Sequence, residues 1–203
     1  MNNKLYVFLG TYCELIDYAI LEKKYYKSDI SVSNSEFERM LFQGFLNIGC
    51  ESIMLSAPSV GMWPISCKKI LFNEKYRNKN YITCPHLTIY GIKNFSKSIS
   101  LKKVFIKIVK ENLNKEIVVV GCEAHKPYLK ILKYAKTKYK FKTCLIVPDL
   151  PDNMIFSKNR IYTIFKKINV KNIYKLTNKY VDCFYFFTST MCESFDLKNK
   201  KYI

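Results

Sequence analysis

The most constraining feature of the sequence is a short apolar run, Cys144–Val147, with lysines before it and prolines after it. A run of this length, made of β-forming residues without alternation, is typical of a strand buried in a parallel sheet. Pro148 and Pro151 lack the N–H group that a sheet ladder needs, so the strand must end there. Asp149 and Asp152 are therefore expected just past a strand's carboxyl end, where open α/β sheets bind ligands. A purely local role for both carboxylates, in Asx-turns or as helix caps, explains them equally well.

Similar runs alternate along the chain with segments of helical period. The expected strands cover 5–9, 52–56, 87–90, 116–120, 144–147 and 183–187, and the expected helices cover 35–48, 99–113, 128–139 and 159–180. This alternation predicts an α/β fold, a Rossmann-like doubly wound parallel sheet of about six strands. Segment 12–34 is expected to be irregular or partly helical, and segment 62–84 has no clear period.

Two helix starts carry the pattern of a capping box. In Ser35-Glu-Phe-Glu38 and in Thr190-x-x-Glu193, the hydroxyl and the carboxylate are expected to satisfy free backbone amides of the first helical turn. The last residues, 198–203, are expected to form no further element.

Length and charge limit the class of protein. A chain of 203 residues suits a single domain, and 49% hydrophobic residues argue against disorder. A net charge of +18 favours anionic partners such as nucleic acid, anionic lipid or phosphorylated substrates. The lysines are spread over the whole chain, however, and a solvated basic surface explains them as well. The basic amphipathic helix expected at 99–113 could lie on an anionic membrane or serve as an ordinary crossover helix.

Cysteine spacing and hydropathy indicate the cellular compartment in which the protein is expected. None of the eight cysteines forms a Cys-x-x-Cys pair, so zinc-ribbon spacing is absent and no metal site is expected. The first strand begins without a signal-peptide core, and no apolar run reaches the roughly 18 residues of a spanning helix. We expect a cytoplasmic protein with free thiols that meets a membrane, if at all, from its inner surface.

Further candidate ligand-binding residues follow other expected strands. Gly10 and Thr11 follow the first strand, Ser56 ends the second, and His125 follows the strand at 116–120. In a parallel sheet these positions are expected to share one edge with Asp149 and Asp152. The chain has neither Gly-x-Gly-x-x-Gly nor a Walker A motif, so neither nucleotide fingerprint is met.

Several pieces, taken in order, resemble the amino-terminal half of a family 4 glycosyltransferase of the GT-B fold, from bacterial surface-polysaccharide synthesis. The matching pieces are the capped helix ending Phe45-Leu-Asn-Ile-Gly49, the stretches 52–60 and 147–154 (Val-Pro-Asp-Leu-Pro-Asp-Asn-Met), and 180–191. The resemblance covers almost the whole chain as one amino-terminal domain, 1–203.

The resemblance implies an acceptor-binding half of a sugar-transferring enzyme. Many family members carry a histidine in the loop after the fifth strand, where this chain has Pro148 and Asp149. Asp149 is therefore the expected catalytic group near the acceptor hydroxyl, unless that role lies elsewhere. Gly10, Thr11, Ser56, His125 and Asp152 are the expected acceptor-binding residues.

The family's donor-binding carboxyl-terminal domain is expected to be missing. The chain alone should then need no cofactor and bind no nucleotide-sugar donor, and it should be inactive. The expected partners are a saccharide or lipid-linked sugar acceptor, a partner chain carrying the donor domain, and an anionic membrane surface, but not nucleic acid. The alternative function is a non-catalytic Rossmann-like module that interacts with a partner or recruits it to a membrane.

Overall fold

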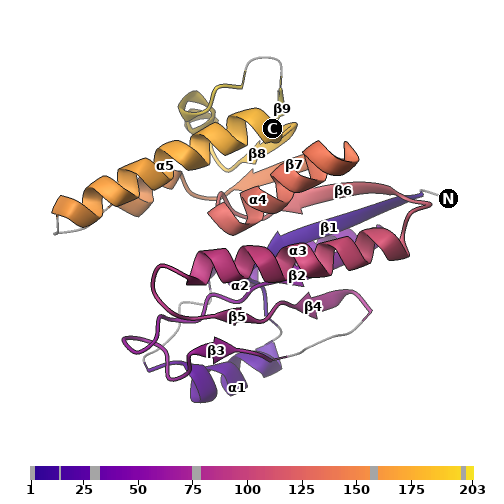
Figure 1. Cartoon of the computed structure of the whole chain (residues 1–203). Helices are drawn as coiled ribbons and strands as arrows, with labels where there is room; N and C mark the ends of the chain where they lie inside the picture. The colour runs from indigo at the N-terminus through magenta and orange to yellow at the C-terminus, as the bar shows by residue number, and fades with distance from the viewer. Residues whose placement is uncertain (1–2, 14, 28–32, 75–78, 156–159, 198–199) are drawn as a thin grey trace. The chain divides into compact units, whose positions relative to one another are not determined.

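A computed structural model describes residues 3–13, 15–27, 33–74, 79–155, 160–197 and 200–203 (Figure 1). Its residue contacts divide the chain into two compact units, 1–117 and 118–203. Parallel strands with helices beside them form both units, so the predicted α/β class with a Rossmann-like parallel sheet is confirmed. Parts of the predicted segment 12–34, at residues 14 and 28–32, lie outside the described residues, as does residue 159 of the last predicted helix.

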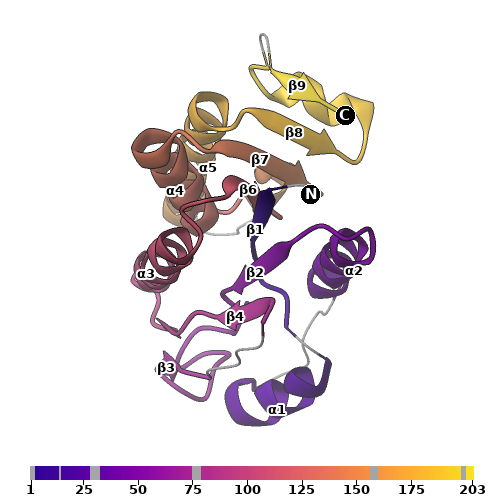
Figure 2. The ribbon, with the colours of Figure 1, turned by 90° about the vertical axis from the view of Figure 1, so that its right-hand side faces the viewer.

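Three parallel strands form the centre of the first unit. They are β1 (Lys4–Gly10), β2 (Ser52–Ser56) and β4 (Tyr81–Thr83), in the order β4-β2-β1. Their last residues are register partners, Gly10 with Ser56 and Ser56 with Thr83, so the three carboxyl ends are level. Helices α2 (Ser33–Asn47) and α3 (Lys93–Glu111) lie on opposite faces of these strands (Figure 2), which is the doubly wound arrangement.

The third parallel strand lies earlier in the chain than predicted. The strand expected at 87–90 is replaced by β5 (His86–Leu87), which pairs antiparallel with β3 (Leu71–Phe72) in a separate two-stranded sheet. β4 takes the parallel position beside β2, although it has only three residues. Pro85 separates β4 from β5, and its missing N–H group prevents one strand from continuing into the other.

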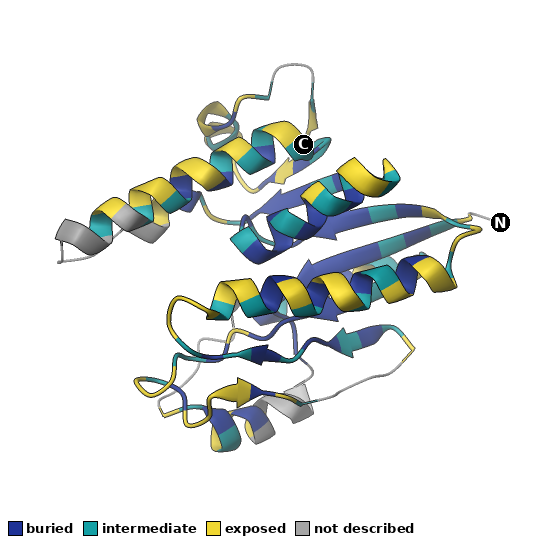
Figure 3. Cartoon of the chain, viewed as in Figure 1, coloured by how far each residue is buried: buried dark blue, intermediate teal, exposed yellow. Residues whose placement is uncertain are grey.

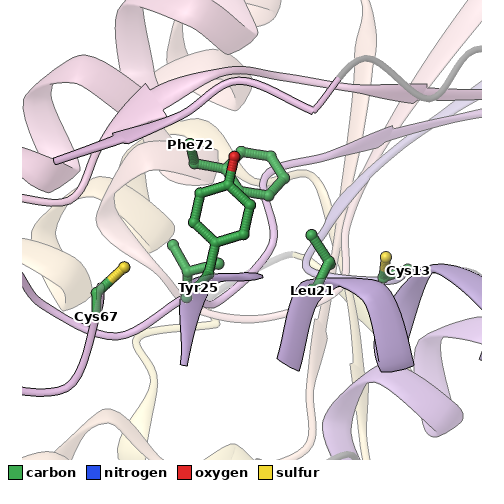
Figure 4. Packing of buried hydrophobic residues seen from close by; sticks show 6 residues of the cluster. Cys13, Leu21, Tyr25, Cys67 and Phe72 are labelled. Carbon is green, nitrogen blue, oxygen red and sulfur yellow. The ribbon is translucent and has the colours of Figure 1, made fainter. Parts of the chain in front are cut away.

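Aromatic side chains hold α2 against β1. The ring of Phe8 makes edge-to-face contacts with Phe42 and Phe45 at centroid distances of 5.5 and 5.0 Å. Figure 3 shows the buried interior of the strands. A second apolar cluster joins α1 (Leu15–Tyr25) to the loops after β2, through Cys13, Leu21, Tyr25, Val60, Cys67 and Phe72 (Figure 4).

Four parallel strands form the second unit. They are β6 (Glu116–Gly121), β7 (Lys142–Val147), β8 (Cys183–Phe186) and β9 (Lys201–Tyr202), paired in that order. Helix α4 (Lys126–Tyr134) continues into a π-helical turn, and α5 (Arg160–Tyr180) packs beside α4 on the same side of β7 and β8 (Figure 2).

Three predicted boundaries in the chain are wrong. Helix α3 begins at Lys93, six residues before the predicted start at position 99. Thr190 lies inside a short 3₁₀ helix, Ser189–Ser194, whose cap position is Thr188, so Thr190 caps nothing. The last residues do form an element, because β9 pairs with β8.

All eight cysteines are free thiols. Cys13, Cys67, Cys84 and Cys122 are buried, as small apolar side chains of the core. Within the described ranges, no helix combines the length and the apolar character needed to cross a bilayer.

Candidate functional site

The loop after β1 is held by a buried carboxylate. Glu38 of α2 is 2% exposed, and its carboxylate accepts hydrogen bonds from the backbone N–H groups of Thr11 and Tyr12, both at 2.6 Å. The Thr11 hydroxyl donates to the same carboxylate at 3.3 Å. In α/β proteins, backbone amides of a loop that follows a strand can bind the anionic group of a ligand. Here a side chain of the protein itself supplies that anion.

The same carboxylate explains the glycine at the end of β1. A Cβ atom at Gly10 would lie 2.8 Å from Glu38 Cδ and 3.0 Å from Oε1, closer than side-chain atoms pack. Gly10 therefore allows Glu38 to approach the backbone.

The remaining polar groups of this loop also bond within the first unit. The Ser35 hydroxyl accepts a hydrogen bond from Cys13 N–H at 3.2 Å. The Tyr12 carbonyl accepts hydrogen bonds from the hydroxyl groups of Ser56 and, at 3.1 Å, Tyr81. Ser56 is fully buried and Thr11 is 8% exposed. The expected binding residues Gly10, Thr11 and Ser56 thus lie together, where β1 and β2 end, and Thr11 and Ser56 both bond within the first unit.

The capping box predicted at the start of α2 is wrong. The helix begins at Ser33, so Ser35 lies inside it and cannot be its N-cap residue. Both Ser35 and Glu38 face the loop after β1, and their oxygens accept hydrogen bonds from that loop's amides. The amides that Ser35 and Glu38 bind belong to this distant segment and not to the first turn of α2.

Two lysines of α3 fix the loop that follows β2, a role with no sequence signal. Lys97 is 1% exposed, and its ammonium group donates hydrogen bonds to the carbonyls of Ala57 at 2.8 Å and Pro58 at 3.0 Å. The ammonium group of Lys93 donates to the carbonyl of Val60. Burial lowers the pKa of Lys93. The buried Lys97 and the half-buried Lys93 thus hold the loop after β2 through its carbonyl groups.

A buried histidine lies near Lys97, in a segment that the sequence analysis did not select. His86 is 2% exposed, its Nδ1 lies 3.1 Å from the carbonyl oxygen of Cys84, and its ring packs on Phe72. A carbonyl can only accept, so Nδ1 carries the proton and Nε2 is the unprotonated nitrogen. Burial, and then the charge of Lys97, lower the pKa of His86 to about 2. Burial also raises the pKa of the neighbouring Cys84 thiol to about 12.

In the second unit, Asp149 and Asp152 follow β7 as predicted. Asp149 comes two residues after Val147, the last residue of β7, and is exposed. Within the described ranges its carboxylate makes no hydrogen bond or ion pair. Asp152 lies in a short 3₁₀ helix, Pro151–Ile155, and accepts a hydrogen bond from the Tyr174 hydroxyl of α5. Asp152 therefore has a structural partner, whereas Asp149 presents its carboxylate to solvent.

His125 occupies the N-cap position of α4, with an extended backbone at φ −98° and ψ 134°. Its side chain makes no capping hydrogen bond, and its ring contacts Tyr128 edge-to-face at 5.5 Å. Pro127 in the first helical turn favours a helix start here. His125 follows β6 within the same unit as Asp149.

A basic groove between α4 and α5 is a feature that the sequence analysis missed. Its volume is about 350 Å³, and its lining is Lys126, Lys133, Asn172, Lys175, Leu176, Lys179 and Tyr180. The ammonium groups of Lys133 and Lys179 lie 5.4 and 5.5 Å from the centre of the Tyr180 ring. Four lysines and an aromatic ring around one hollow can hold a phosphate or carboxylate group. Lys175 and Lys179 are spaced i, i+4, which places them on the same side of α5.

Among the residues that the structure describes, no three His, Cys, Asp or Glu side chains are grouped so that they could hold a metal ion.

Comparisons of the chain with protein-family models, with curated proteins and with solved structures found no match.

Proposed function

We propose that the chain is the acceptor-binding half of a glycosyltransferase that moves a sugar from a nucleotide-sugar to a saccharide or lipid-linked saccharide. The observation that carries the proposal is the exposed Asp149 carboxylate. It follows the buried strand β7 of a parallel sheet, in the Val-Pro-Asp-Leu-Pro stretch that resembles family 4 enzymes. A carboxylate in this place can accept the proton of an attacking hydroxyl.

Two other features fit an acceptor-binding half. The amides after β1, which could bind the phosphates of a nucleotide, already donate to Glu38. The lysine-lined groove between α4 and α5 suits the negative charge of a phosphate-bearing acceptor. An acceptor joined to a lipid would also bring the chain to the inner surface of a bacterial membrane.

Binding of acceptor saccharides tests the proposal without any donor domain. We expect a mixture of lipid-linked saccharides extracted from bacterial membranes to bind the chain in a sedimentation assay in detergent. The variant Asp149→Asn should bind about tenfold more weakly, since it loses a charge-assisted hydrogen bond to a hydroxyl. Glu193→Gln, which changes another exposed carboxylate of the second unit, should bind like the wild type. Absence of binding, or equal binding by both variants, would contradict the proposal.

The second candidate is a non-catalytic module that recruits a partner or a membrane. The internally bonded loop 10–13 favours it, because the amides of residues 11, 12 and 13 all donate to side chains of the first unit. The saccharide assay separates the two candidates, since a recruiting module has no need to bind sugar.

A further inference from the structure

Exposed apolar side chains gather in two segments of the first unit. We define the aromatic patch as Trp63, Ile65, Ile70, Tyr90, Ile92 and Phe95, whose exposed fractions run from 38% to 74%. Scattered single apolar residues are normal on a protein surface, but a group of this size marks an interaction site.

Backbone pairing brings the two segments side by side. Trp63 N–H donates to the Thr88 carbonyl at 3.1 Å, and Thr88 N–H donates to the Ile70 carbonyl at 2.8 Å. The strands β3 and β5 continue this pairing. Ile92 directly precedes α3, and Phe95 lies in its first turn. The exposed residues of the loop that follows β5 are yellow in Figure 3.

The charge around the patch is strongly positive. Among the described residues of 57–110, seven lysines are exposed, and Glu74 is the single acidic residue. Glu74 is itself paired, with the ammonium group of Lys24 at 2.5 Å and the hydroxyl of Tyr25 at 2.7 Å. Lys68 and Lys69, within the first segment, are exposed. The partner of this surface must therefore accept apolar groups and carry negative charge.

From these observations we propose that the aromatic patch docks the first unit on an anionic phospholipid bilayer. Tryptophan, tyrosine and phenylalanine favour the boundary between lipid headgroups and chains, and lysines beside them pair with anionic headgroups. A second copy of the chain would bring the same positive charge against itself, so self-association through this surface is disfavoured. The docking adds a partner to the proposed function but does not depend on it, because vesicle binding needs no saccharide.

Trp63 gives a direct measurement, because it is the only tryptophan in the chain. Its fluorescence should shift to shorter wavelength when phosphatidylglycerol-rich vesicles are added to the full chain, and should change little with pure phosphatidylcholine vesicles. An unchanged emission with both kinds of vesicle would overturn the proposal.

Two matched triple variants test whether the aromatic patch is the surface that binds the vesicles. Ile65→Ser, Ile92→Ser and Phe95→Ser together should reduce binding to phosphatidylglycerol-rich vesicles by roughly 30-fold, measured by co-sedimentation. The control, Ile48→Ser, Leu113→Ser and Ile164→Ser, changes three exposed apolar residues elsewhere and should bind like the wild type. Circular dichroism and urea midpoints check that both variants fold.

Three other outcomes would overturn the proposal. They are equal losses in both triple variants, wild-type binding by the patch variant, and a dimer that forms through the patch in sedimentation equilibrium without lipid. If the patch variant fails to fold, the Trp63 emission of the wild type still decides the question.

Discussion

Replacing Glu38 by alanine is expected to lower the free energy of unfolding by about 3–4 kcal/mol, because two buried amides lose a charged acceptor. The backbone N–H groups of Thr11 and Tyr12 both donate to one oxygen of this carboxylate at 2.6 Å. The carboxylate is buried against Gly10, so alanine would leave both donors without an acceptor in the interior. Urea unfolding followed by circular dichroism measures the loss.

Two further variants separate this contact from a general effect on α2. Glu38→Gln keeps an oxygen that can accept both bonds and loses only the charge, so it should cost about 1–2 kcal/mol. Glu36→Ala removes a neighbouring glutamate whose partner is Arg39, three residues along the same helix, and should cost less than about 0.5 kcal/mol. If Glu38→Ala costs no more than Glu36→Ala, the loop is not held by this carboxylate.

Acidification from pH 7.5 to pH 5 is expected to destabilise the chain by about 2 kcal/mol through His86 alone. Burial, followed by the charge of Lys97, lowers the pKa of His86 from 6.5 to about 2. Between these values the unfolded chain binds a proton that the folded chain does not. The stability from neutral His86 is therefore complete above pH 6.5 and is lost progressively as the pH falls below it.

The pH prediction has a matched pair of controls. His86→Asn places an amide donor where Nδ1 donates to the Cys84 carbonyl, and it should remove most of the stability change between pH 7.5 and pH 5. His125→Asn changes the other histidine and should leave the change in place. Glu74 and Asp182 have lowered pKa values, so their contributions are lost only at more acidic pH. Urea midpoints of the wild type and both variants at the two pH values measure this change in stability. An unaltered pH dependence in His86→Asn would contradict its assignment to His86.

The fold class could be predicted because the strands of a parallel sheet are buried and stop sharply. Cys144–Val147 lies within β7, with Pro148 after it, and Ser52–Ser56 is β2 itself. The strand β4 was missed because Tyr81–Thr83 is too short for a periodic signal. Segment 87–90 is not a parallel strand, because Leu87 is its one residue that pairs with β3, and that pairing is antiparallel.

Site residues could be predicted where their position follows from chain order, as for a residue that directly follows a strand. Contacts between segments that lie far apart in the sequence could not be predicted. Asp149 follows a strand and was found for that reason. The hydrogen-bond partners of Ser35 and Glu38 lie more than twenty residues away, and a local sequence motif does not identify such partners. The burial of Lys97 was equally hidden, because a lysine on a helix normally faces solvent. The basic groove depends on how α4 packs against α5, which charge spacing along one helix does not specify.

The two proposals concern different units and different chemistry. Acceptor binding depends on polar groups after β7 in the second unit, whereas membrane docking depends on apolar side chains of the first unit. Each can therefore fail alone. A chain that bound vesicles but no saccharide would support the recruiting module over the glycosyltransferase half.

The most direct measurement of the central claim is a map of backbone amide shifts on a ¹⁵N-labelled chain titrated with the same saccharide extract. If the chain binds a sugar acceptor beside Asp149, the largest shifts will fall on residues 149–153, just after β7, and Asp149→Asn will weaken them. Largest shifts at the hollow of about 710 Å³ near the start of β1, lined by residues such as Lys4 and Cys50, would contradict the claim.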